Sequence, residues 1–87
     1  MMQERVLSVL YTKRKRDARD PGLGLIQLER LTGCPRELLD FHLWSLRDKG
    51  WIDRVDDDGS IAITANGVDQ SLLLHRHNGT QKITNQQ

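Results

Sequence analysis

The sequence lacks the features that mark secreted, membrane-spanning and disulfide-bonded proteins. Only one cysteine, Cys34, stands among its 87 residues, which excludes an internal disulfide and a zinc site built from several cysteines. It has no long apolar run of the kind that forms a signal peptide or a membrane span. We therefore expect a cytoplasmic protein that does not act in a membrane.

The chain also lacks a strong net charge. Its 13 basic and 12 acidic residues give +1, so the molecule as a whole creates no field that attracts nucleic acid. Local clustering matters more, and one dense basic cluster consists of Lys13, Arg14, Lys15 and Arg16. Cations at the end of a helix interact well with the helix dipole, and the same cations can contact phosphates. Both interpretations of the cluster stay open.

Residue patterns that would support catalysis or metal binding are scarce. His75 and His77 point to different sides of a helix and have no acidic or thiolate partner at ligand spacing. His42 lies beside an apolar stripe, which favours a neutral core histidine bonded to backbone. Cys34 begins a helix but has no second thiol to resolve an oxidised form. We predict no enzymatic activity, metal site or cofactor.

Residues 1–77 are predicted to form one domain, and the polar, aperiodic residues 78–87 a disordered tail. Apolar residues at helical spacing predict a first helix that ends before Asp20-Pro21-Gly22, and a second helix over about Leu25–Thr32 that exposes Gln27 and Arg30. The predicted core-facing residues of these two helices are Met2, Val6, Val9, Leu10, Leu25, Leu28 and Leu31.

The central stretch, residues 32–64, predicts a turn, a helix and a hairpin. Gly33 breaks the second helix, and Pro35 is expected at the first position of the third, where its missing N–H costs nothing. The expected buried stripe of this third helix is Leu39, Leu43 and Leu46, with Leu38 and His42 beside it. The segment Asp48-Lys49-Gly50 is typical of a helix end.

Two strand-like segments follow, residues 51–55 and 60–64, joined by the turn-forming sequence Asp56-Asp57-Asp58-Gly59. Thr64 is a suitable N-cap for a fourth helix that continues through Val68, Leu72 and His75. The run of leucines at 72–74 is too broad for one helical stripe, so at least one should face away from the core. Such a leucine either lies in a dimer interface or is tolerated at the surface.

These residues resemble the winged helix-turn-helix domains of small prokaryotic transcriptional repressors. The resemblance covers roughly residues 2–76. The turn is represented by Leu31-Thr32-Gly33, and the end of the wing by Ile63-Thr64-x-x-Gly67. The recognition helix and its exit are represented by His42-Leu43, Leu46 and Gly50-Trp51-Ile52. The spacing in the third helix is similar to the arsenic-responsive repressors, and the end of the hairpin looks more like the antibiotic-resistance regulators.

The resemblance implies an α+β fold with a three-helix core, a two-stranded wing and a fourth helix. It also implies that Leu23 adds a short strand to the hairpin. We expect one shared core formed by Leu28, Leu39, Leu43, Leu46, Ile52 and Ile63.

By the same resemblance, the partner is double-stranded DNA, the assembly is a homodimer through the fourth helix, and the start of the third helix enters the major groove. The implied base-contacting residues are Arg36, Glu37, Asp40 and Phe41. The implied phosphate-contacting residues are Gln27, Arg30, Lys13, Arg14, Lys15 and Arg16, with Arg54 in the wing.

Two features depart from the repressor pattern. Glu37 and Asp40 are acids on the face that would meet DNA, where phosphates repel them. In the wing, Arg54 stands against four aspartates, Asp53, Asp56, Asp57 and Asp58, for a net charge of −3.

A second hypothesis therefore stays open, in which the domain binds protein. Phe41 and Trp44, rimmed by Glu37, Asp40 and Asp48, would form an aromatic patch of the kind that anchors protein partners. Packing of Trp44 against the first helix or the wing would argue against this hypothesis. The solvent exposure of Phe41 and Trp44 is the feature that distinguishes the protein-binding hypothesis from the DNA-binding one.

Overall fold

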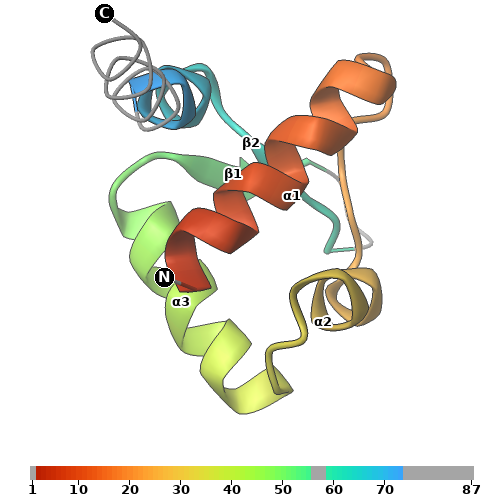
Figure 1. Cartoon of the computed structure of the whole chain (residues 1–87), viewed down its shortest axis with the longest axis vertical. Coiled ribbons are helices and arrows are strands. Elements are labelled where there is room, and N and C mark those ends of the chain that lie inside the picture. Colours follow the sequence, from red (N-terminus) through yellow and green to blue (C-terminus); the bar gives the residue numbers. More distant parts are fainter. Residues whose placement is uncertain (1, 56–58, 74–87) are drawn as a thin grey trace, which may run out of the picture.

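The computed structural model describes residues 2–55 and 59–73, and in these residues the chain is a small α+β protein (Figure 1). The helices are α1 (Met2–Arg16), α2 (Leu25–Thr32), α3 (Arg36–Asp48) and a further helical segment at residues 65–73. The strands β1 (Ile52–Arg54) and β2 (Ile61–Ile63) form a two-stranded antiparallel sheet. The α+β class and the order of elements predicted from the sequence are confirmed.

Local backbone chemistry sets the ends of α2 and α3. Gly33 ends α2 in the left-handed conformation, with φ of 70°, and its N–H donates to the Glu29 carbonyl. Pro35 is the N-cap of α3, one residue earlier than the position predicted for it, because its ψ of 149° is extended. Gly50 takes a second left-handed conformation, with φ of 79°, where the chain leaves α3.

The hairpin is shorter than the predicted segments, and Leu23 pairs with it at one position. Ile52 pairs with Ile63 and Arg54 with Ile61. Leu23 forms an isolated antiparallel bridge to Ile61, with N–H to O distances of 2.8 and 2.9 Å in the two directions. At Leu23, where a short strand was expected, the described chain forms this single bridge, which fixes the segment before α2 against the hairpin.

One apolar core joins α1, α2, α3 and the hairpin. All six residues predicted to share it are buried together, namely Leu28, Leu39, Leu43, Leu46, Ile52 and Ile63. The first helix contributes Val6, Leu7 and Leu10, of which Leu7 was missing from the predicted set. Val9 is only partly buried. Cys34 lies inside this cluster, which gives the thiol a packing role and shields it from solvent.

The predicted burial of Leu31 is wrong, because 58% of this residue is exposed, while Thr32 is buried. Thr32 follows Leu25 by seven positions, which is nearly two helical turns, so both residues lie on the same face of α2. Leu31 is rotated far from this face. The Thr32 hydroxyl tolerates burial because it donates to the Leu28 carbonyl at 2.6 Å and accepts from the Cys34 N–H at 3.2 Å. Leu38, expected beside the buried stripe of α3, is also exposed, at 56%.

Residues 65–73 are anchored through Thr64 to the link between α3 and β1. Its hydroxyl accepts from the Gly67 N–H at 3.0 Å, which confirms the predicted N-cap, and donates to the Gly50 carbonyl at 2.6 Å. Leu72 and Leu73 are both exposed, as expected of at least one leucine in the run. Within the described helices, none is long and apolar enough to cross a membrane.

Several sequence predictions fall outside the described residues. They concern the turn at Asp56, Asp57 and Asp58, then Leu74, His75 and His77, and the tail at 78–87.

Candidate binding surface

The outward side of α3 is the most distinctive surface of the described chain. Positions three and four apart on a helix share a face, and on α3 this places two aromatic residues among acids. We call this surface the α3 outer face, and its members are Glu37, Asp40, Phe41, Trp44 and Asp48. All are exposed. The burial of Leu39, Leu43 and Leu46 on the opposite side of the helix fixes this orientation.

Phe41 is 60% exposed and Trp44 is 65% exposed. Trp44 therefore does not pack into α1 or the hairpin. Phe41 meets the His42 ring edge-on, with the ring centroids 5.6 Å apart. His42 is half-buried, and its Nδ1 lies 3.3 Å from the Gln3 side-chain nitrogen of α1, so its partner is a side chain and not the predicted backbone group. Two large aromatic side chains are thus left to solvent on a rigid helix.

Two of the residues predicted to contact DNA around α3, Arg36 and Gln27, are engaged by other groups of the protein. Arg36 forms an ion pair with Glu29 of α2. Gln27, expected to contact phosphate, instead accepts the Gly24 N–H at 3.0 Å and so caps α2. Arg30 is exposed on α2, as predicted. The structure therefore leaves fewer free cations near α3 than the sequence suggested.

Charge along α3 itself is acidic overall. Its two arginines stand against three acids, a net charge of −1 over the helix. Arg47, for which the sequence carried no signal, has its Nε 3.6 Å from Oδ1 of Asp53 on β1. A surface of this composition repels phosphate more than it attracts it.

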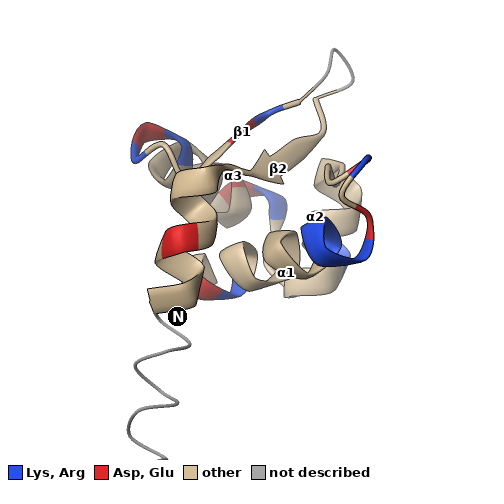
Figure 2. Ribbon diagram, turned by 90° about the horizontal axis from the view of Figure 1, so that it is seen from above, with Lys and Arg blue, Asp and Glu red and all other residues tan. Residues whose placement is uncertain are grey.

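The basic cluster lies at the other end of the molecule from α3. Lys13, Arg14, Lys15 and Arg16 form the last turn of α1, and the two views show this turn well away from α3 (Figures 1 and 2). Lys13 donates to the Asp20 carbonyl and lies 3.8 Å from the Asp17 carboxylate, so it closes the turn after α1. Lys15 lies over the Tyr11 ring, 5.4 Å from its centroid. Arg14 and Arg16 are exposed.

The hairpin contributes one exposed cation next to an exposed acid. Arg54 and Asp53 are neighbours on β1, and the aspartate-rich turn that follows lies outside the described residues. A pocket of about 260 Å³ opens between this hairpin, α3 and the start of α2. Residues far apart in the sequence form it, and the sequence carried no signal for it.

Within residues 2–55 and 59–73, no group of three or more histidine, cysteine, aspartate or glutamate side chains is placed to hold a metal ion. Comparison of the chain with protein-family models, with curated proteins and with solved structures finds no match.

Proposed function

We propose that the chain is a cytoplasmic winged-helix binding module whose α3 outer face docks a protein. The element order of three helices and a hairpin, with the bridge at Leu23, supports the winged-helix assignment. The observation that carries the proposed partner class is the exposure of Phe41 and Trp44 on one helix face. Exposed aromatic residues of this kind are enriched at the energetic centres of protein interfaces.

The acids around the aromatics specify the partner further. Glu37, Asp40 and Asp48 would attract basic side chains and repel a nucleic-acid backbone. An arginine or lysine of the partner could also lie over the Trp44 indole, where a cation is attracted to the ring face. The partner chemistry that fits is a protein segment carrying apolar and basic side chains.

This proposal is tested by selecting a displayed library of random peptides against the folded chain. We expect enriched peptides to lose at least tenfold in affinity, about 1.4 kcal/mol or more, with Phe41→Ala and with Trp44→Ala, because each substitution removes an exposed anchor. Ile26→Ala is the matched control, since Ile26 is an equally exposed apolar residue on α2. Thermal melts verify that all three variants fold. No enriched peptide, or peptides indifferent to both aromatic substitutions, would overturn the proposal.

A second candidate function is a DNA-binding transcriptional regulator. The exposure of the predicted base-contacting residues on α3, namely Arg36, Glu37, Asp40 and Phe41, favours it. In this case Arg36 would read a base, while Arg30, Gln27, Arg54 and the basic end of α1 would contact phosphates. The net negative charge of α3 and the distance of the basic cluster from it argue against this candidate, which we therefore propose second.

The basic end of α1 provides the test of duplex binding. We expect weak, salt-sensitive binding to any sequence, and replacement of Lys13, Arg14, Lys15 and Arg16 by glutamine should weaken it throughout. The dependence of log K on log salt should flatten by about 0.9 for each phosphate that the protein no longer neutralises. Fluorescence anisotropy with a mixed-sequence duplex at several salt concentrations measures both effects.

The same titration distinguishes the regulator from non-specific binding. If Arg36 reads a base, Arg36→Ala should cost about 1–3 kcal/mol at one base position and relax the preference there. A weakening that is uniform across sequences would instead show that Arg36 contributes only charge.

We also propose that the chain is a homodimer through its C-terminal helix. Leu72 and Leu73 are both exposed in the helical segment at residues 65–73, and a partner copy would cover them. Sedimentation at tens of micromolar should show the dimer, and Leu73→Glu should dissociate it by placing a charge in the interface. Ile26→Glu is the control. A wild-type monomer at that concentration would contradict the dimer.

A further inference from the structure

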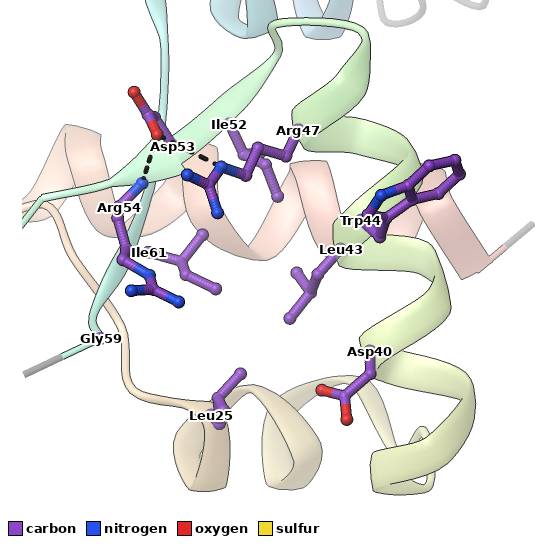
Figure 3. Close-up of a pocket in the computed structure, with 10 residues that line it drawn as sticks. All are labelled: Leu25, Asp40, Leu43, Trp44, Arg47, Ile52, Asp53, Arg54, Gly59 and Ile61. Atoms are coloured by element: carbon purple, nitrogen blue, oxygen red, sulfur yellow. Dashed lines mark hydrogen bonds and ion pairs between the residues drawn. The ribbon is translucent and has the colours of Figure 1, made fainter.

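The pocket beside the α3 outer face has an apolar interior. Leu25 of α2, Leu43 of α3, Ile52 of β1 and Ile61 of β2 contribute side chains that face its centre (Figure 3). Two of these, Leu43 and Ile52, belong to the buried core, so the floor of the pocket is continuous with the rigid interior. A rigid apolar floor favours binding because little order has to be created when a partner docks.

Charged side chains surround this apolar interior. Arg47 and Asp53 form an ion pair, with Nε of the arginine 3.6 Å from Oδ1 of the aspartate. Asp40 and Arg54 make no side-chain hydrogen bond or ion pair to any other described residue, and they lie on opposite sides of the pocket (Figure 3). Asp40 on α3 and Arg54 on the hairpin therefore present opposite charges across the pocket.

The size of the pocket limits its occupant. Its volume of about 260 Å³ is below the range of roughly 300–1,000 Å³ that is usual for small-molecule and cofactor sites. One large apolar side chain suits it better. The pocket is also continuous with the α3 outer face, because Trp44 and Asp40 belong to both.

We infer that this pocket is the anchor point of the docking surface and that it receives one apolar side chain of the bound protein segment. The segment carries a basic residue on the α3 side, facing Asp40, and an acidic residue on the hairpin side, facing Arg54. The inference rests on the proposed function, since it specifies the partner of that same surface. Charge complementarity with Asp40 on one side and Arg54 on the other fixes the direction in which the segment crosses the pocket.

Peptides selected from the displayed random library on the wild-type chain test the inference. We expect an enriched pattern in which one apolar residue is flanked by a basic residue on one side and an acidic residue on the other. Arg54→Glu should weaken the selected peptide roughly tenfold, because an attraction becomes a repulsion, and Asp40→Lys should act in the same direction. Both residues are exposed, so neither substitution threatens the fold. Arg14→Glu, the same charge change at the far end of α1, is the control.

A charge exchange in the peptide adds a readout that a purely structural effect would not give. Replacing the acidic residue of the peptide by lysine should restore binding to Arg54→Glu while weakening binding to the wild-type chain. Methyl NMR spectra should show the wild-type peptide perturbing Leu43 and Ile61, which line the pocket.

The outcomes separate the inference from the proposed function. Peptides that depend on Phe41 but ignore Arg54→Glu and Asp40→Lys would overturn the pocket and leave the docking face standing. Absence of any enriched peptide would overturn both. Charge exchange that fails to restore binding would also remove the assigned role of Arg54.

Discussion

Replacing Leu46 with alanine should lower the free energy of unfolding by about 2–5 kcal/mol. Leu46 is completely buried on α3, in the cluster that also holds residues of α1, α2 and the hairpin. Truncation removes its apolar packing and leaves a cavity that a small, densely packed core cannot fully close. Because small domains are stable by only about 5–15 kcal/mol, this destabilisation should be evident in urea unfolding.

Leu38→Ala is the matched control for that experiment. It removes the same side chain from the same helix, but Leu38 is exposed and contributes little apolar burial. We expect its effect to stay within about 0.5 kcal/mol, as for most surface substitutions. Equal destabilisation by the two variants would contradict the assigned orientation of α3.

Replacing Gly67 with alanine should also destabilise the fold strongly, although alanine normally stabilises a helix by about 1 kcal/mol relative to glycine. A Cβ atom at Gly67 would overlap the Trp51 carbonyl oxygen and lie 2.6 Å from Cγ1 of Ile63. The Trp51 carbonyl also accepts the Thr64 N–H at 2.9 Å, so it cannot move away without breaking that bond. We expect a destabilisation of about 1–3 kcal/mol or more from this overpacking.

Asn66→Ala provides the comparison for Gly67→Ala. Asn66 is exposed in the same first helical turn, where alanine should be neutral or slightly favourable. Thermal melts of both variants measure the contrast. A gain in stability for Gly67→Ala would show that the C-terminal helix does not approach the hairpin closely.

The order of elements and most of the core could be predicted from the sequence, because helical periodicity and the signals at Gly33, Pro35 and Gly50 all act locally. Leu31 shows where the prediction failed. It is more apolar than Thr32, yet the helical period places Thr32 over Leu25, and two hydrogen bonds make burial of its hydroxyl acceptable. Hydrophobicity alone suggested the wrong residue.

The candidate site could be predicted only in part. Exposure of Phe41 and Trp44 follows from the position of the buried stripe of α3, so their shared face was accessible to sequence reasoning. The pocket was not, because Leu25, Leu43 and Ile61 come together only through the packing of three elements. The engagement of Arg36 by Glu29 was equally hidden, since it depends on how closely α2 approaches α3.

The central claim is that the α3 outer face serves a protein partner and not duplex DNA. Amide chemical-shift mapping of the labelled chain with a mixed-sequence duplex, at about 50 mM salt where phosphate contacts are strong, tests it most directly. We predict small shifts confined to the basic end of α1, around Arg14 and Arg16, with α3 unaffected. Saturable shifts centred on Phe41 and Trp44 would contradict the claim and favour the DNA-binding regulator.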